Sequence, residues 1–358
     1  MSRLIRAVID TKALQHNLGI IRARAGSARV MAVVKANAYG HGLVPTALAL
    51  GQADAFAVAR LEEGLALRAA GITRPIVLLE GVFSAAQLEE AAHHGLELVV
   101  HDALQIELLE GRRGTQPLVL WIKIDTGMHR LGFPTEEFTA ALERVRRLTP
   151  APLELRLLTH LACANERDEA VTRAQLARFR QATRGLQYAV SIANSAGLLG
   201  AVPLGCDWVR PGLALYGASP FADCSASDLG LKPVMTLASS VIAVRRVARG
   251  ESVGYGGAWV AARDSLIAII AAGYGDGLHR SLAGGTPVLV DGERAPLAGR
   301  VSMDMMAVDV SGLRGVRVGT PAILWGAGLP VDEVARHAGT IPYELLCSVS
   351  QRVPLEPR

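Results

Sequence analysis

Reactive and anion-binding side chains stand at or just after the ends of short apolar runs in the first two thirds of the chain. Lys35 closes the run RVMAVVK, and His160 closes the run LELRLLTH. An amine in this position can act as a nucleophile toward a carbonyl group when burial or neighbouring cations favour its neutral form. Comparable positions near other runs are held by Lys123, Arg130, Asn194, Ser195 and Arg210. One such residue is usually structural, so their convergence is the evidence for a site.

Two glycine-containing segments follow the last of these apolar runs, NSAG at 194–197 and RPGLALYG at 210–217. Loop amides and a helix N-terminus in such segments can hold a phosphate group. A nucleophilic lysine opposite a phosphate site meets the two needs of pyridoxal phosphate, a Schiff base and an anchor. The residues therefore predict pyridoxal phosphate as cofactor, bonded to Lys35.

Alternating apolar runs and amphipathic stretches must position these side chains. The strand candidates are residues 29–35, 55–60, 74–81, 96–102, 117–125, 153–160, 188–195 and 207–212. Stretches with helical spacing of apolar residues occupy 61–71, 85–95 and 135–148. This α/β pattern predicts an N-terminal (β/α)8 TIM barrel over residues 1–235, whose active site lies where strands end and loops begin.

The pattern changes after residue 235, where β-like runs separated by glycine replace the helices. Residues 236–358 are therefore expected to form a C-terminal, β-strand-rich domain with one short helix at 332–339. The first few residues of the chain could pair with this domain.

Composition narrows the class of protein. The 37 Lys and Arg residues against 33 Asp and Glu are scattered, so no nucleic-acid partner is expected. The four cysteines are far apart and predict neither a metal site nor a disulfide framework. The N-terminal segment lacks the apolar core of a signal peptide, and no apolar run approaches the ~20 residues that span a bilayer. We expect a cytoplasmic protein with no membrane partner.

The sequence resembles those of the alanine racemase family, whose members are fold-type III pyridoxal-phosphate enzymes. The resemblance covers nearly the whole chain and rests on ordered segments that include VVKANAYGHG, KIDTGMHRLG, ANSAG, DWVRPGLALYG, VGYGG, GYGDG, GRVSMDMMAVDV and GTIPYELLC. It implies a homodimer with shared active sites that interconverts L- and D-alanine. Such an isomerase supplies D-alanine for peptidoglycan or serves alanine catabolism.

The resemblance also assigns catalytic roles. Lys35 would carry the cofactor and act as the base on one face of it, while Tyr255 of the second subunit would act on the opposite face. His160 and Arg210 would support the ionised tyrosine through hydrogen bonds, and Arg210 would face the pyridine nitrogen.

Binding roles follow in the same way. Arg130 and Met303 would bind the substrate carboxylate, with Met303 donated by the partner, and Lys123 would be carbamylated. Tyr274 and Asp304 would line the active-site entrance. The remaining cofactor-binding residues would be Tyr39, Asn194, Ser195, Gly212, Leu213 and Tyr343.

One position departs from the pattern of many members of the family. Ser191 stands where a histidine often contacts the arginine equivalent to Arg210, so the pH profile can differ here. The alternatives to an alanine-specific enzyme are a racemase of the same fold for serine, lysine or arginine, a barrel-type decarboxylase, and a non-catalytic carrier of pyridoxal phosphate. The carrier would be a barrel alone, and the decarboxylase would lack the pairing of Tyr255 with Arg210.

Overall fold

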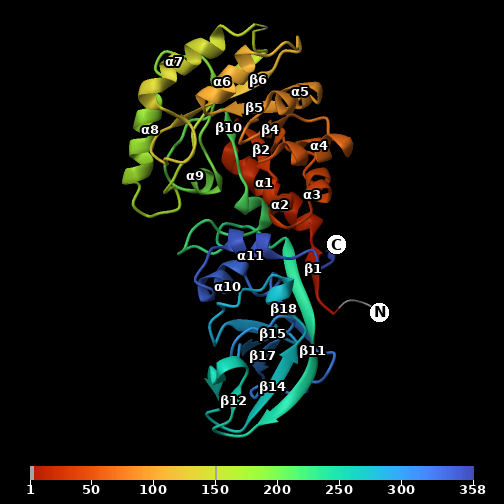
Figure 1. Cartoon of the computed structure of the whole chain (residues 1–358). Coiled ribbons are helices and arrows are strands. Elements are labelled where there is room, and N and C mark those ends of the chain that lie inside the picture. The colour runs from red at the N-terminus through yellow and green to blue at the C-terminus, as the bar shows by residue number, and fades with distance from the viewer. Residues whose placement is uncertain (1–3, 150) are drawn as a thin grey trace.

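Parallel strands close a barrel in the computed structural model, which describes residues 4–149 and 151–358 (Figure 1). The barrel is closed by the pairing of β5 with β6, which joins the two ends of the series β5, β4, β3, β2, β10, β9, β8 and β6. Its strands are β2 (Arg29–Val33), β3 (Ala55–Val58), β4 (Ile76–Leu78), β5 (Glu97–Val100), β6 (Val119–Asp125), β8 (Glu154–Leu158), β9 (Ala189–Ser191) and β10 (Trp208–Val209). The predicted TIM barrel is confirmed.

Burial on both faces explains the continuous apolar runs of these strands. All four residues of β3, AFAV, are buried, and so are all four residues of β5, ELVV. A barrel strand has side chains in the interior on one face and helices on the other, so it does not alternate between apolar and polar residues.

Helices surround the barrel, and local sequence sets their ends. Ser84 caps α5 by accepting a hydrogen bond from the Gln87 amide, and Asp102 caps α6 in the same way. The helices are α1 (Thr11–Ala25), α3 (Leu43–Ala49), α4 (Leu61–Ala69), α5 (Ala85–His93), α6 (Ala103–Glu110), α7 (Thr135–Arg146), α8 (Ala170–Ala182) and α9 (Ser195–Leu199). β7 (Phe133–Pro134) extends the sheet beside β6.

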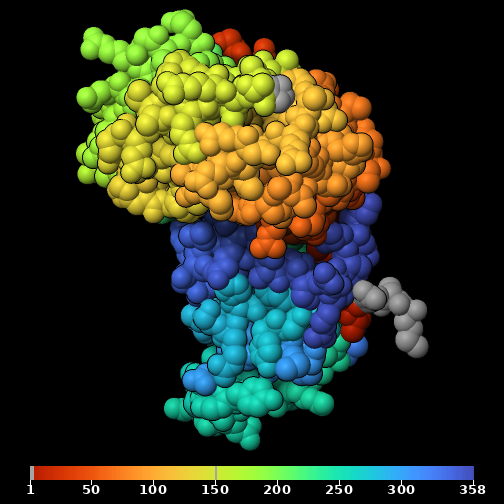
Figure 2. Space-filling view, turned by 45° about the horizontal axis from the view of Figure 1, so that its top comes forward, coloured from red at the N-terminus to blue at the C-terminus, as the bar shows by residue number. Residues whose placement is uncertain are grey.

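The C-terminal part is rich in strands, as predicted, and is organised by the long strand β11 (Met235–Val247). β11 pairs with β1 (Arg6–Ile9), β14 (Ser265–Ile270) and β18 (Pro321–Trp325). The other strands are β12 (Ser252–Val253), β13 (Trp259–Val260), β15 (Pro287–Val290), β16 (Glu293–Pro296), β17 (Met306–Asp309) and β19 (Leu355–Pro357). In Figure 2 the barrel and this domain form two lobes, with C-terminal residues directly beneath the barrel.

Two helices of the C-terminal domain lie between its sheet and the barrel (Figure 1). α10 (Val331–His337) matches the predicted helix, but α11 (Pro342–Ser348) is a second helix that the sequence pattern did not predict. The Leu346 carbonyl of α11 approaches Gly40 so closely that a Cβ atom at Gly40 would lie 2.2 Å from it. The C-terminal domain thus contacts the segment that follows the first barrel strand. No helix in the described ranges is long and apolar enough to cross a membrane.

Candidate active site

Lys35 lies at the barrel mouth, in a turn with unusual backbone geometry. The strand β2 ends at Val33, so Lys35 does not end the strand as expected but begins the segment α2 (Lys35–Tyr39). The next four residues, Ala36 to Tyr39, have φ angles of 53°, 53°, 54° and 52°. For residues with a Cβ atom, this left-handed conformation costs roughly 1–2 kcal/mol each. Surrounding groups must therefore hold this segment, which we call the lysine turn (residues 35–42).

Side-chain acceptors fix the outer side of the lysine turn. The Glu63 carboxylate accepts hydrogen bonds from the amides of Ala36, at 2.7 Å, and Ala59, at 2.9 Å. Asn37 accepts a hydrogen bond from the Leu43 amide at 2.9 Å. Sequence reasoning missed Glu63, although a glutamate at the third position of a helix is a known signal of a residue that binds backbone amides.

Tyr39 is the last non-glycine residue of the left-handed stretch and is buried among aromatic rings. It stacks on Tyr216 with ring centres 4.7 Å apart, and its ring centre is 5.8 Å from that of Tyr343 on α11. Tyr216 in turn donates a hydrogen bond to the Val33 carbonyl at 2.9 Å. A Cβ atom at residue 212 would lie 2.4 Å from the Tyr39 hydroxyl oxygen, so a side chain there would displace the Tyr39 ring. The structure thus brings together the predicted residues Tyr39, Gly212 and Tyr343.

The loops after β9 and β10 meet at a buried serine. Asn194 caps α9 by accepting a hydrogen bond from the Gly197 amide at 2.9 Å. Ser195 Oγ accepts hydrogen bonds from the amides of Gly212, at 3.0 Å, and Ala214, at 3.2 Å, which places it beside the short helix η1 (Leu213–Tyr216). A hydroxyl that accepts two bonds still has its own hydrogen to donate, and an anion is a suitable acceptor.

Cations also gather at the mouth. Lys123 on β6 is buried, and its pKa is lowered to about 8, first by burial and then by the charges of Arg210, Arg130 and Lys35. Burial also lowers the pKa of Arg210, to about 10, which leaves its guanidinium charged at neutral pH. The mouth is therefore a strongly positive environment that favours anionic ligands.

Arg210 is fixed by neutral acceptors. Its Nη1 donates to Ser191 Oγ at 2.6 Å, and its Nη2 donates to the Thr159 carbonyl at 2.6 Å. The same Nη2 lies 3.4 Å from His160 Nδ1. Burial, followed by the charge of Arg210 and those of neighbouring cations, lowers the pKa of His160 to about 2. His160 is therefore a neutral imidazole, and because Arg210 can only donate, its Nδ1 is the acceptor and its Nε2 carries the hydrogen.

Besides Tyr343, four other predicted site residues lie in the C-terminal domain. Tyr255 begins the short helix η2 (Tyr255–Gly257), two residues after β12, and β12 lies at the end of the molecule remote from the barrel (Figure 1). Its side chain is 67% exposed. The Met303 carbonyl accepts a hydrogen bond from the Gly275 amide, next to Tyr274, and Asp304 pairs with Arg352 at 2.7 Å. Within one chain, the structure does not bring Tyr255 to Lys35.

The residues at the mouth fit pyridoxal phosphate. The Ser195 hydroxyl and the Tyr39 hydroxyl, beside Gly212, offer donors to a phosphate group. Arg210 offers a fixed cationic donor to a ring nitrogen, and Lys35 offers the amine. In the part of the chain that the structure describes, no group of three or more His, Cys, Asp or Glu residues is placed to hold a metal ion.

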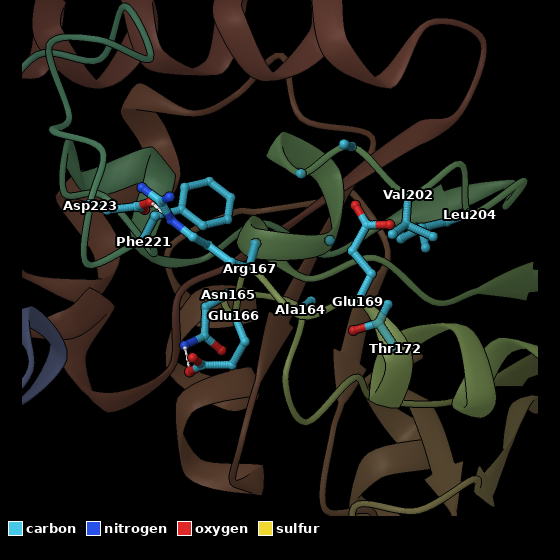
Figure 3. Close-up of a pocket in the computed structure, with 14 residues that line it drawn as sticks. Ala164, Asn165, Glu166, Arg167, Glu169, Thr172, Val202, Leu204, Phe221 and Asp223 are labelled. Carbon is cyan, nitrogen blue, oxygen red and sulfur yellow. Dashed lines mark hydrogen bonds and ion pairs between the residues drawn. The ribbon is translucent and has the colours of Figure 1, made fainter.

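A separate cavity of about 180 Å³ lies beside the mouth, between the loop after β8 and helix α9 (Figure 3). Ala196 and Gly197 of the NSAG segment form part of its wall, and Arg167 pairs with Asp223 at its edge. None of the predicted site residues lines this cavity. It is therefore distinct from the candidate active site.

A TIM barrel with a lysine turn, a buried serine beside a glycine loop and an arginine at its mouth, followed by a strand-rich domain, is the architecture of barrel-type pyridoxal-phosphate isomerases. The chain belongs to the alanine racemase family. Residues 9–220 match the family model "Alanine racemase, N-terminal domain", and residues 234–356 match "Alanine racemase, C-terminal domain".

Individual relatives agree over their full lengths. The chain is 49% identical over 351 residues to the alanine racemase of Vibrio parahaemolyticus, and 51% identical over 350 residues to that of Nitrosococcus oceani, with 98% of each chain covered in both cases. The crystal structure of biosynthetic alanine racemase from Pseudomonas aeruginosa matches with a TM-score of 0.97 at 47% identity, covering 100% of both chains. The alanine racemase of Acinetobacter baumannii matches with a TM-score of 0.94 at 40% identity, also covering 100% of both chains.

Proposed function

We propose that the chain interconverts L- and D-alanine with pyridoxal phosphate carried on Lys35. The observation that carries this proposal is the meeting of the lysine turn with the Ser195 and Gly212 cradle, at a mouth lined by Lys123, Arg130 and Arg210. We infer alanine as the substrate because the relatives are named alanine racemases. We place the domain boundary between residues 235 and 236, at the start of β11, which pairs with strands of the C-terminal sheet and not with those of the barrel.

The chain would hold the cofactor through both sides of the mouth. Its phosphate would contact Ser195, Tyr39 and Tyr343, together with the amides of Gly212 and Leu213, with Asn194 holding the loop of Ser195 in place. Arg210, kept rigid by Ser191 and Thr159, would face the pyridine nitrogen. When bound, the cofactor withdraws electrons from the amino acid attached to it and makes the α-proton acidic.

Racemisation needs a proton acceptor on one face of the α-carbon and a proton donor on the other, and the two groups exchange these roles in the reverse direction. The Lys35 amine would serve one face. Arg130 would bind the carboxylate of the substrate, since a planar guanidinium can form paired hydrogen bonds with it. A carbamate on Lys123 would add the negative charge that orients Arg130.

Tyr255 of the partner subunit would serve the other face. Tyr255, Tyr274, Met303 and Met305 are 67%, 39%, 52% and 43% exposed, although each is large and apolar. The segment of Tyr255 also adjoins Arg300, three residues before Met303. An exposed apolar surface of this kind marks an interaction site, and a homodimer would bring it to the mouth of a second barrel.

His160 would help Tyr255 of the partner subunit to ionise. A free tyrosine has a pKa near 10, so a phenolate at neutral pH needs donors around it. His160 is neutral and carries its hydrogen on Nε2, while Nδ1 faces Arg210. Its Nε2–H group can therefore donate a hydrogen bond to the phenolate while the imidazole stays neutral.

The cellular role we propose is the supply of D-alanine for peptidoglycan in the cytoplasm. The likeness to the biosynthetic enzyme of Pseudomonas aeruginosa, at 47% identity, supports this role over a catabolic one.

The direct test is incubation of the pure protein, with pyridoxal phosphate added, with L-alanine and then separately with L-serine, L-lysine and L-arginine. Chiral chromatography should detect D-alanine, with far slower turnover of the three larger substrates. Absence of D-alanine from protein with bound cofactor would refute the proposal, and equal turnover of larger substrates would refute alanine specificity.

The site of cofactor attachment can be tested separately, because the chain contains only four lysines, Lys12, Lys35, Lys123 and Lys232. Borohydride reduction of the loaded enzyme should fix the cofactor on Lys35, as read by peptide mass spectrometry. Its recovery on another lysine would show that the assignment of Lys35 is wrong.

A further inference from the structure

His41 lies beneath the lysine turn and contacts its backbone. The side chain is 1% exposed, and its Nδ1 atom is 3.0 Å from the Ala38 carbonyl and 2.9 Å from the Tyr39 carbonyl. A carbonyl oxygen can only accept, so Nδ1 must carry the hydrogen and donate it to this pair. The two acceptors belong to the last two of the four consecutive non-glycine residues with left-handed φ angles.

The imidazole ring also joins the turn to its neighbours. It packs on Tyr216 with ring centres 4.6 Å apart, and the other stacking partner of Tyr216 is Tyr39. Tyr216 holds the end of β2 through the Val33 carbonyl. His41 is thus in contact with both the turn that begins at Lys35 and the aromatic group that supports Tyr39.

The other ring nitrogen faces away from the turn. His41 and Thr46 line a cavity of about 70 Å³ whose other walls include Leu14 and Leu355. Neither His41 Nε2 nor Thr46 Oγ1, both buried, has a hydrogen-bond partner among the described residues. One water needs only about 10–15 Å³ of such space, so solvent can satisfy these two atoms. The contacts of His41 with protein polar groups are therefore made through Nδ1.

We propose that His41 is a positioning residue for racemisation. Its Nδ1–H group holds the carbonyls of Ala38 and Tyr39 in the left-handed conformation, and this fixes Lys35 and Tyr39 relative to the Gly212 loop. The inference rests on the proposed function for the identity of the cofactor. The effect on the turn itself can be measured without any cofactor.

Two substitutions separate the Nδ1 contact from the rest of the ring. His41→Phe keeps a ring against Tyr216 but removes both hydrogen bonds, whereas His41→Asn places an amide donor close to the position of Nδ1. For His41→Phe we expect amide hydrogen exchange at residues 36–42 of the apoprotein to rise about tenfold or more, which is the scale of a lost buried hydrogen bond. The dissociation constant of pyridoxal phosphate should rise by a similar factor. The fall in kcat should be larger than any change in KM.

His41→Asn should stay within about threefold of wild type in these measurements, because the donor is kept. His93→Phe, an exposed histidine on α5, is the matched control and should change nothing. If His41→Phe has the same amide exchange, cofactor affinity and kcat as the wild type, the proposal is wrong. A His41→Asn variant as impaired as His41→Phe would also overturn it.

If His41→Phe does not fold, His41→Gln replaces it in the comparison, because its longer amide reaches the position of Nε2 instead of Nδ1. His41→Gln should then lose cofactor affinity while His41→Asn keeps it, and equal behaviour of the two would overturn the proposal. A wild-type protein that fails to racemise alanine would refute the proposed function and leave the contrast in amide exchange as a separate result.

Discussion

Lys123 is a buried lysine beside other cations at the barrel mouth, and this environment changes its chemistry. With a pKa of about 8, roughly a tenth of the amine is neutral at pH 7, compared with less than a thousandth for a lysine in water. A neutral amine attacks carbon dioxide, forming an N–C bond and releasing a proton. The product is an anion, which the charges of Arg130 and Arg210 would stabilise.

We therefore expect the protein to carry one carbamate when it is equilibrated with ¹³C-bicarbonate, visible as a carbonyl signal in its ¹³C spectrum. Lys123→Arg should remove the signal, while Lys12→Arg, at an exposed lysine, should keep it. A spectrum that is unchanged by Lys123→Arg would contradict the prediction. Loss of the carbamate in Lys123→Arg should also raise KM for alanine, because Arg130 would lose the anion that orients it.

His41 makes the stability of the protein sensitive to acid. Burial lowers its pKa to about 4 in the folded protein, against roughly 6.5 in the unfolded chain. Between these pH values the unfolded chain binds a proton that the native state excludes, so the free energy of unfolding falls as the pH falls, by at most about 1.4 kcal/mol per pH unit. Urea unfolding of the apoprotein from pH 7 to pH 4.5 measures this slope.

His41→Asn should give a shallower slope than wild type over this interval, and His93→Asn should give the wild-type slope. Equal slopes in His41→Asn and wild type would show that His41 is not the group responsible. The comparison uses slopes, so a constant loss of stability in either variant does not affect it.

Single residues show how far sequence alone could reach at this scale. The strand ends and the family motif pointed to Lys35, Ser195 and Arg210, and the structure places these at one mouth. Glu63 and His41 were not singled out. Glu63 stands at a helix position typical of a residue that binds backbone amides, whereas a buried imidazole that binds backbone carbonyls has no distinctive spacing in the sequence. The Ser191 contact with Arg210 shows that a neutral acceptor supports the guanidinium here.

The lysine turn and helix α11 form one unit at the level of secondary-structure elements. Gly40 has a φ of 81°, and its missing side chain lets the Leu346 carbonyl of α11 approach. Gly71 has nearly the same φ, 82°, but a Cβ atom there would meet nothing within 4 Å. These two glycines allow backbone strain to be separated from steric overlap.

Gly71→Ala should cost about 1 kcal/mol of stability, from the left-handed conformation alone. Gly40→Ala should cost at least about 3 kcal/mol or weaken cofactor binding, because the new methyl group displaces α11 from the turn. Urea unfolding and titration with pyridoxal phosphate check both outcomes. Similar stability losses with unchanged cofactor affinity in the two variants would show that the contact with α11 is unimportant.

Elements with regular hydrophobic patterns were predictable, and those set by tertiary contacts were not. The barrel strands followed from apolar runs such as AFAV, since burial on both faces leaves a clear signal. Nothing in the sequence Ala36–Tyr39 favours four left-handed residues, because that conformation depends on Glu63 and His41 from outside the segment. Helix α11 was missed, although Pro342 at its first position is a recognised helix-start signal.

The position of Tyr255 has consequences for the whole molecule. In one chain this residue lies in the part of the C-terminal domain farthest from the barrel, so Lys35 and Tyr255 of the same subunit would serve different active sites (Figure 1). Sequence motifs identified both residues, and the family resemblance alone predicted that Tyr255 comes from the second subunit, because residue spacing carries no such information.

Mixing two inactive variants tests this arrangement. Lys35→Ala and Tyr255→Phe dimers should each be inactive, whereas a mixed dimer has one site with both substitutions and one site with neither. Random exchange of subunits at equal amounts should restore about a quarter of the wild-type activity per chain, because half of the dimers are mixed. No recovery after verified exchange would show that each subunit completes its own site.

The sheet of the C-terminal domain includes strands from distant parts of the chain, since β1 pairs with both β11 and β19. Thr11 donates a hydrogen bond to the Arg358 carbonyl, 347 residues away. During synthesis on the ribosome, β1 emerges long before its partners β11 and β19. It therefore stays unpaired while the whole barrel is made. The barrel can mature early from contacts between neighbouring segments, but the sheet closes last and slowly, as non-local pairings do. Newly made chains would therefore expose the unpaired β1 edge for most of their synthesis, and this interval is when they are most vulnerable to aggregation.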